Sequence, residues 1–304
     1  MPVTPLAASA TGVGEHLVRA GRVSAALDHL LADTPPSVES LALLVECRLA
    51  RGEMDLAGRA GSALSARGNL STDDAARRSL ALAELAAATD RDAEAVARAH
   101  QVDSDALPWR QVAALSLIRL GRRADGEQLA TEQLALSRAA GSPYHLAGAL
   151  RTSAAVCATV DIEGQLREAY ALATGRFERL AAQVATDLAG LLALTGRDRL
   201  GAVALLREAE EYADVEDLWP LHVRVRRLLE RLDEQPKLPR TEAMERLTQA
   251  QLLICTLAAT GSTNRAIADH LRISVKAVEG HLSHAYKKLE ISGRAQLPQV
   301  LRLP

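Results

Sequence analysis

Aromatic residues are scarce in this chain of 304 residues, since Phe, Trp and Tyr together make up 2% of it. Ala and Leu dominate instead, and that mixture favours closely packed helices over β-rich folds, which use aromatic and β-branched side chains. The sequence therefore predicts an all-α protein. A single Phe in the whole chain also cannot line an aromatic pocket for a small ligand.

The sequence also lacks the motifs of the common catalytic classes. No Gly is followed by Lys, so the phosphate-cradling loop G-x-x-x-x-G-K-[ST] is absent and an ATPase is excluded. We find no Ser-His-Asp arrangement or paired carboxylates, and no alternating β/α pattern of a receiver domain. The many Asp and Glu are better interpreted as solvated helix faces and caps. We therefore expect no enzymatic activity and no cofactor.

Cysteine is rare as well, and Cys47, Cys157 and Cys255 lie far apart among apolar neighbours. They are typical of small buried side chains in a reducing compartment. The first residues, MPVTPLAASATGVG, lack the basic start and continuous apolar core of a signal peptide, and no apolar stretch is long enough to span a membrane. We expect a cytoplasmic protein without membrane contact.

Charge is distributed unevenly along the chain. Residues 240–304 hold nine basic and five acidic side chains, a net charge of +4, which leaves −6 for the remainder of a chain whose formal net charge is −2. All four Lys lie from Lys237 onward. A basic C-terminal segment on an otherwise acidic chain is typical of proteins that bind a polyanion, although solvated surfaces can show the same charge difference by chance.

Turn signals punctuate the chain from Glu15 to Leu232, with apolar residues at helical spacing between them. Because Gly, or Asp as second best, tolerates the left-handed conformation that ends a helix, we expect one helix to end at each of Gly21, Gly52, Asp90, Gly121, Asp161 and Gly196. The intervals are 31, 38, 31, 40 and 35 residues. Five residues after each signal stands a small side chain, Ala26, Ala57, Ala95, Gly126 or Gly201, with Leu166 as the exception.

A period near 34 to 40 with a small residue after the turn resembles the tetratricopeptide class, in which antiparallel helix pairs stack into a curved solenoid. The alternative is an irregular helical bundle with chance spacing.

Pro236 and Pro239 break the helical pattern after this region. We expect a disordered N-terminus at 1–13, a helical-repeat domain at 14–234, a linker at 235–246 and a small domain at 247–304.

After the linker, four short helices are predicted. Thr248 and Gln251 form a capping box for the first helix, whose inner face we assign to Leu252, Leu253 and Leu257. Gly261 ends it.

Thr263 caps a second helix from Asn264 to about His270, with Ile267, Ala268 and Leu271 pointing inward. Ser274 caps the third helix, whose apolar stripe is Val278, Leu282, Ala285 and Leu289. A short helix, a tight turn and a longer helix with one polar, basic face form the helix-turn-helix arrangement that places a recognition helix in the major groove.

This segment resembles the DNA-binding domain of the LuxR family of transcriptional regulators. The matching residues occur in register over about fifty positions: Leu247-Thr248, Gly261, Asn264, Ile267-Ala268, Leu271, Ile273-Ser274, Lys276, Val278-Glu279, His281-Leu282, Tyr286, Lys288-Leu289, Ile291 and Arg294. The stretch from Leu115 to Leu232 also resembles the helical region upstream of this domain in large ATP-binding LuxR-type regulators, whose ATPase domain is missing here.

The resemblance implies a bacterial, sequence-specific regulator that binds double-stranded DNA, with a helix-turn-helix motif at 264–283 and residues 275–289 as the reading helix. Phosphate contacts are expected from Thr263, Asn264, Arg265, Lys276, His284, Lys287 and Lys288. Ser274 caps the reading helix, and Glu279, Gly280 and Ser283 occupy positions that face base edges in relatives. The alternative role for Glu279 is a solvated carboxylate beside nearby cations, and the sequence does not favour one role over the other. Arg294 is expected to tie the last helix to the core, and His281 to pack rather than to bind a metal.

The family usually has Glu at the positions of Gln251 and Ala266, and Thr at the position of Ala277. Pro298 falls inside the last helix, the dimer surface by resemblance, so the helix starts late or kinks. We expect a homodimer on DNA, contact with RNA polymerase, and control by an unknown protein or small-molecule effector at the helical-repeat domain. The alternative function is a protein-interaction adaptor with a degenerate DNA-binding domain.

Overall fold

The computed structural model describes residues 10–234 and 247–301, and all regular structure in these two ranges is helical. The chain divides into two compact units, residues 1–236 and 237–304. Residues 1–9 and the expected linker at 235–246 lie outside the described residues. The first helix begins at Ala10, within the segment that we expected to be disordered, since we placed the start of the domain at residue 14.

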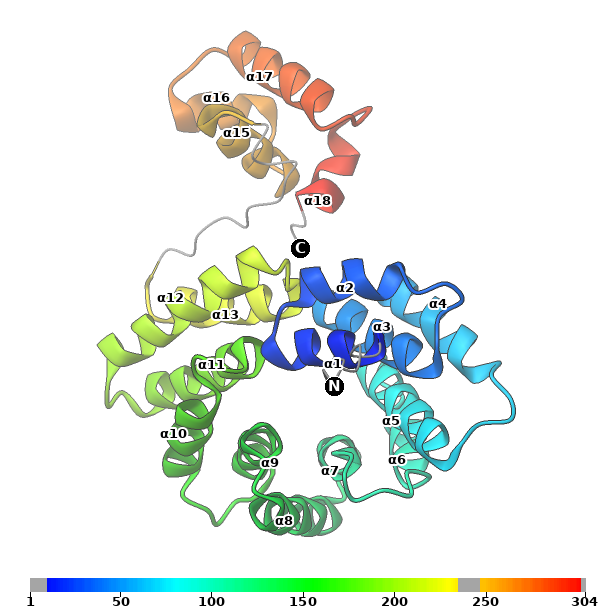
Figure 1. Ribbon diagram of the computed structural model, residues 1–304. Helices are drawn as coiled ribbons and strands as arrows, with labels where there is room; N and C mark the ends of the chain where they lie inside the picture. Colours follow the sequence, from blue (N-terminus) through cyan, green and yellow to red (C-terminus); the bar gives the residue numbers. More distant parts are fainter. Residues whose placement is uncertain (1–9, 235–246, 302–304) are drawn as a thin grey trace, which may run out of the picture. The chain divides into compact units, whose positions relative to one another are not determined.

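The described part of the first unit consists of six consecutive helix pairs followed by one further helix (Figure 1). In chain order they are α1 (Ala10–Ala20) with α2 (Val23–Leu31), α3 (Val38–Arg51) with α4 (Met54–Ser65), α5 (Thr72–Ala88) with α6 (Asp92–Ala99), α7 (Trp109–Arg119) with α8 (Arg123–Ala140), α9 (Pro143–Val156) with α10 (Ile162–Ala173), α11 (Glu178–Thr195) with α12 (Arg199–Val215), and α13 (Trp219–Arg231). Together with the solved structure compared below, this arrangement confirms the tetratricopeptide-like repeat rather than an irregular bundle.

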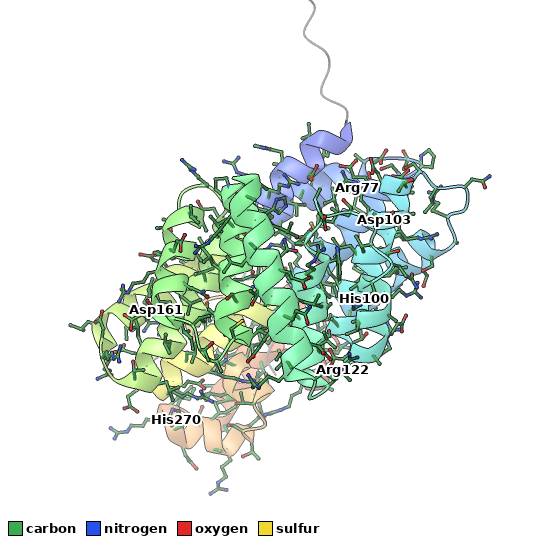
Figure 2. The ribbon with its side chains drawn as sticks, turned by 90° about the horizontal axis from the view of Figure 1, so that it is seen from below. Arg77, His100, Asp103, Arg122, Asp161 and His270 are labelled. Atoms are coloured by element: carbon green, nitrogen blue, oxygen red, sulfur yellow. The ribbon has the colours of Figure 1, made fainter. Side chains whose placement is uncertain are left out.

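Each of the six turn signals lies between the two helices of one pair. Gly21, Gly52, Gly121 and Gly196 have φ values between +64° and +87°, and Asp90 has a φ of +57°, so all five take the left-handed conformation that was expected. Asp161 differs, and the expectation that it ends a helix is wrong. Its φ is −71°, and it lies at the rim between α9 and α10, where its carboxylate accepts a hydrogen bond from the backbone N–H of Gly164 at 2.9 Å (Figure 2). Asp is a good N-cap because a short carboxylate reaches such an N–H.

The small residues after the turns allow the second helix of a pair to approach the first closely. Ala26, Ala57 and Ala95 have no exposed surface. At Gly126, a Cβ atom would lie 3.0 Å from the carbonyl oxygen of Ala114, tighter than most side-chain contacts. The repeat signal in the sequence is therefore a packing signal.

The first helices of the unit also contact the last ones, which closes the stack into a ring. In Figure 1, α1 and α3 lie beside α11 and α13, and contacts join α1 to α11 and α3 to α13. The Tyr212 hydroxyl donates to the carbonyl oxygen of Gly21, and the backbone N–H of Ser24 donates to a Glu216 carboxylate oxygen at 2.7 Å. A Cβ at position 21 would lie 2.5 Å from the backbone nitrogen of Arg179, so glycine is required there for a second reason besides its positive φ.

The second unit has its own apolar core. It is built from α15 (Gln249–Ala259), α16 (Asn264–Leu271), α17 (Val275–Lys288), the 3₁₀ turn η1 (Arg294–Gln296) and α18 (Leu297–Val300). Its buried residues are Ile254, Cys255, Ala258, Ile267, Ala268, Val278, Leu282, Ala285, Leu289, Leu297 and Leu301. Placing Leu253 on the inner face of the first helix was wrong, because its side chain is 43% exposed. Ile254 and Ala258 lie on the buried face of this helix, and Leu252 and Leu257 are partly buried at its margins.

All three cysteines are buried free thiols, as the sequence indicated. Burial raises the pKa of Cys47 to about 12 and that of Cys255 to about 11. Both thiols are therefore protonated near neutral pH and pack as small apolar groups. No helix within residues 10–234 and 247–301 combines the length and the apolar character needed to cross a bilayer.

Candidate nucleic-acid interface

Three side-chain caps fix where the helices of the second unit begin. The Thr248 hydroxyl accepts from the backbone N–H of Gln251 at 3.3 Å, and the Gln251 amide oxygen accepts from the backbone N–H of Thr248 at 3.1 Å, which completes the predicted capping box. Thr263 accepts from the N–H of Ala266 at 3.2 Å, and Ser274 from that of Ala277 at 3.1 Å. The cap expected at each helix start is confirmed.

The turn between α16 and α17 depends on one left-handed residue. Arg272 ends α16 with φ 54° and ψ 44°, and the next backbone N–H, that of Ile273, donates to the carbonyl oxygen of Ala268 at 3.0 Å. Arg272 is exposed, so the turn adds a cation beside the start of α17. The sequence predicted a turn here without a contact residue, and the signal for the added cation is Arg272 itself.

Helix α17 has one buried and one exposed face. Val278, Leu282 and Ala285 are buried, and Leu289 follows them directly after the helix, as the apolar stripe predicted. The opposite side exposes Lys276, Glu279, Ser283, His284, Lys287 and Lys288, and Gly280 lies among them half-buried. Residues three, four and seven apart share one side of a helix, so these polar groups form one surface, which we call the α17 face.

Two groups on the α17 face have particular geometry. A Cβ at Gly280 would have no atom within 4 Å, so a bound molecule could approach the helix backbone closely at this point. His284 Nδ1 lies 2.7 Å from the Gly280 carbonyl oxygen, which leaves Nε2 directed away from the backbone. When both ring nitrogens carry a proton, Nδ1 donates to this carbonyl and Nε2 can donate to an anion.

The other expected contact residues lie at the start of α16. Thr263 and Arg265 are exposed, and Asn264 is half-buried. Asn264 Oδ1 accepts from Arg294 Nη1 at 3.3 Å, and the amide nitrogen of Asn264 is the side-chain group that can donate to a ligand. The fold thus brings one set of residues to the α17 face and a second set to the start of α16.

Arg294 anchors the end of the domain to its first helices, as expected. Its guanidinium donates to the carbonyl oxygens of Ala258, at 2.7 Å, and Ser262. Helix C-termini leave carbonyl groups without partners, and a guanidinium satisfies several of them at once. This side chain therefore supports the helix pair rather than contributing to the exposed basic surface.

The three positions that depart from the family pattern retain working contacts. Gln251 completes the capping box and its amide oxygen also accepts from Lys288 Nζ at 2.9 Å. The backbone N–H groups of Ala266 and Ala277 are held by the caps described above. Lys288 thus has a structural contact as well as its expected contact with phosphate.

The end of the domain is short. The turn η1 precedes α18, and Pro298 occupies the first turn of α18. Backbone N–H groups in a first turn have no partner within the helix, so the absence of one at Pro298 breaks no hydrogen bond. The late start that Pro298 implied is confirmed. Leu297 and Leu301 are fully buried in the domain core, while Ala295 and Gln296 are exposed.

Comparisons with known proteins cover both units. Residues 245–301 match the family described as "Bacterial regulatory proteins, luxR family". Among solved structures, the Rap conjugation gene regulator of the plasmid pLS20 in complex with the Phr* peptide is similar, with a TM-score of 0.53 and 16% identity over 92% of this chain and 78% of that chain. At this identity the likeness concerns the fold alone. No curated protein matches the chain.

Proposed function

Because residues 245–301 form a DNA-binding domain of the luxR family of bacterial regulatory proteins, we propose that the chain is a sequence-specific transcription regulator controlled through its helical-repeat unit. The observation that carries the proposal is the α17 face, a polar and basic surface on a helix whose opposite side is buried. Such a helix suits the major groove of double-stranded DNA, where side chains reach base edges.

The roles of the individual residues follow from their chemistry and exposure. The exposed cations Arg265, Lys276 and Lys287 contact phosphates and supply salt-dependent affinity. Glu279 and Ser283 face base edges, where a carboxylate accepts from a cytosine amino group. Gly280 lets the helix lie close to the DNA.

A matched pair of variants tests the phosphate contacts. Each lost contact flattens the dependence of log affinity on log salt by about 0.9, so Lys276→Ala combined with Lys287→Ala reduces the slope by roughly 1.8. The control changes the exposed Arg227 and Arg231 of α13 to Ala, which removes the same charge far along the chain from the α17 face. Fluorescence anisotropy with a promoter fragment over a salt series gives both slopes. An equal slope in the wild type and the Lys276/Lys287 variant contradicts the assignment.

Base recognition is tested separately, by selection from randomised DNA. Glu279→Ala relaxes the preference at one base-pair position of each half-site, because only the contact of that side chain is lost. Lys287→Ala leaves the preferred sequence unchanged while weakening binding to all sequences. An unchanged sequence preference for Glu279→Ala would place this carboxylate in solvent instead.

The intact caps favour a working DNA-binding domain over the alternative of an adaptor with a degenerate one. Gln251, Ala266 and Ala277 each take part in the contacts that start a helix, although the family usually has other residues there. Footprinting on an adjacent promoter distinguishes the two functions, since an adaptor protects no sequence.

The wider mechanism is dimeric binding in the bacterial cytoplasm, with contact to RNA polymerase and no catalytic step. The neighbouring Rap regulator is in complex with a peptide, and we propose that the helical-repeat unit of this chain likewise takes an effector, a peptide or protein. The exposed residues before α18 are the candidate dimer surface. Sedimentation with DNA carrying one or two half-sites gives the stoichiometry, and a complex that stays at one chain on two half-sites excludes the dimer.

A further inference from the structure

The inside of the helical-repeat ring holds two hollows that meet at Glu46 and Glu84. The larger, of about 400 Å³, is lined from α3, α5, α9, α11 and α13. The smaller, of about 140 Å³, opens toward α1 and is lined by the apolar side chains Leu43, Leu80 and Tyr144 together with the charged Glu15, Arg19 and Arg77. The larger hollow has the volume of a typical ligand site, and such sites combine apolar walls with a few polar groups.

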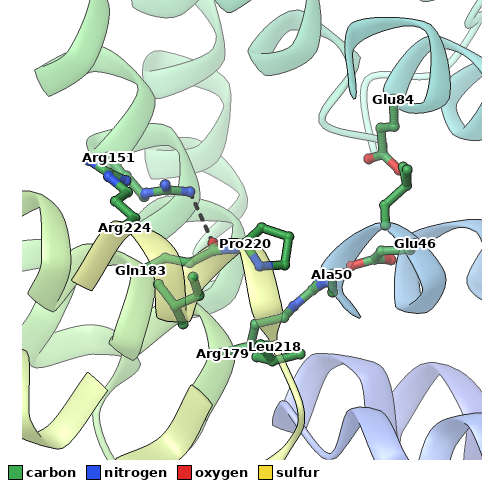
Figure 3. A pocket seen from close by; sticks show the side chains of 11 residues that line it. Glu46, Ala50, Glu84, Arg151, Arg179, Gln183, Leu218, Pro220 and Arg224 are labelled. Atoms are coloured by element: carbon green, nitrogen blue, oxygen red, sulfur yellow. Dashed lines mark hydrogen bonds and ion pairs between the residues drawn. The ribbon is translucent and has the colours of Figure 1, made fainter. Parts of the chain in front are cut away.

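The charged groups of the larger hollow are separated into two sides. Figure 3 shows Glu46 and Glu84 on one side, and Arg151 and Arg224 with Gln183 on the other. Arg179 forms an ion pair with Glu46. On the basic side, Arg151 contacts Asp187 at 2.6 Å and Arg224 pairs with the same carboxylate.

Among the residues that line the larger hollow, pairing leaves one negative and one positive charge without compensation. Asp187 neutralises only one of its two arginines, so the basic side keeps an excess of one positive charge. Within the described residues, no hydrogen bond or ion pair reaches the Glu84 carboxylate. On the same helix, Arg78 is six residues away and Arg77, which lines the smaller hollow, is seven, or about 9 and 10 Å along the axis at the rise of an α-helix.

Glu84 is the group that needs an external partner. Its side chain is half-buried where the two hollows meet, and desolvation by burial raises its pKa from the ordinary 4.5 to about 7. An isolated carboxylate in such surroundings is costly to ionise, and a cation placed beside it removes that cost. Carboxyl groups perturbed in this way, facing a cavity, are typical of binding sites.

We propose that this cavity binds a zwitterionic ligand, a free amino acid or a short peptide, with its ammonium group at Glu84 and its carboxylate at Arg151 and Arg224. The first side chain of the ligand is apolar and enters the smaller hollow beside Leu80 and Tyr144. The inference rests on the proposed regulatory role of the helical-repeat unit and specifies the chemistry of its effector.

Affinity selection with mass spectrometry tests the proposal on the full chain. Four mixed pools are offered: free amino acids, tripeptides to pentapeptides with free ends, the same peptides acetylated at the N-terminus, and the same peptides amidated at the C-terminus. We expect at least tenfold greater retention of free-ended ligands than of either blocked pool, with apolar first residues enriched. Retention of the amino acid pool alone identifies the free amino acid as the source, and retention of the free-ended peptides identifies the peptide.

Two variants connect retention to the assigned residues. Glu84→Gln keeps the shape of the side chain and is expected to lose retention at least tenfold, while Glu211→Gln, an exposed position on α12, leaves it unchanged. Arg224→Gln is expected to abolish the discrimination against amidated peptides. Equal retention of acetylated and free peptides, no retention from any pool, or full retention by Glu84→Gln overturns the proposal. None of these readouts involves DNA, so failure here is distinguishable from failure of the DNA-binding function.

Discussion

Replacing Glu84 by Gln is expected to stabilise the helical-repeat unit at neutral pH and to leave it unchanged in acid. The buried carboxyl group has its pKa raised from 4.5 to about 7 by desolvation, and the folded state therefore holds a proton that the unfolded chain has already released. A raised pKa means that stability is lost as pH rises from 4.5 through 7. The amide of Gln resembles the protonated acid and does not titrate.

The size of the effect follows from the two pKa values. A difference of about 2.5 pK units corresponds to about 3 kcal/mol when the carboxyl is fully ionised. The penalty is about 0.4 kcal/mol near pH 4.5, about 1.4 kcal/mol near pH 5.5 and about 3 kcal/mol from pH 7 upward. The free energy of unfolding of Glu84→Gln should therefore exceed that of the wild type by an amount that grows along this curve.

Urea denaturation at a series of pH values measures the effect, followed by tryptophan fluorescence. Both tryptophans of the chain, Trp109 and Trp219, lie in helices of the first unit, so the signal reports this unit alone. Glu211→Gln serves as the control, because its exposed carboxyl should give the same curve as the wild type. A difference between Glu84→Gln and the wild type that is constant with pH, or that is largest in acid, refutes the assignment of a buried uncompensated carboxyl.

Three further substitutions test contacts of the two units. Arg294→Ala removes charged hydrogen bonds to two carbonyl groups and should destabilise the second unit by about 3 kcal/mol, seen as faster hydrogen exchange in α15 and α16; unchanged exchange contradicts the anchoring role. Gln251→Ala should cost about 1 kcal/mol through the lost cap, whereas Gln251→Glu keeps the cap and is neutral or stabilising; calorimetry compares the two, and an equal loss in both variants argues against the capping box. Tyr212→Phe removes the hydrogen bond to the Gly21 carbonyl and should destabilise the ring by about 1 kcal/mol, with exchange rising first in α1 and α2 and not in α7.

The sequence predicted local features well, because these depend on residues close together in the chain. The caps at Thr248, Thr263 and Ser274 could be predicted since each needs only a hydroxyl and the backbone three residues on. Five of the six turns followed from the left-handed conformation of Gly or Asp. Asp161 was assigned to the wrong role because Asp is favoured both after a helix and before one, and the sequence alone does not decide between them.

Features that depend on distant contacts were missed. Nothing in the sequence connects Tyr212 with Gly21, or Arg179 with Glu46, because these contacts arise only when the curvature of the repeat brings its two ends together. The cavity residue Glu84 looked like one of many solvated acids for the same reason. Leu253 was misplaced because Leu252, Leu253, Ile254 and Cys255 are four apolar residues in a row, so hydrophobicity alone could not orient the helix.

The contact between the first and last helix pairs also restricts how the repeat can vary. An open stack can gain or lose a pair at either end, since each pair contacts only its neighbours. Here the rotation added by successive pairs must sum to a full turn before α1 and α3 can meet α11 and α13. A duplication or deletion of one pair would leave the two ends unable to join, so geometry fixes the number of pairs. Sequence variation is then expected in the loops and in individual side chains. Because every pair has a neighbour on both sides, a pair at either end of the chain can open only after the contacts that close the ring are broken.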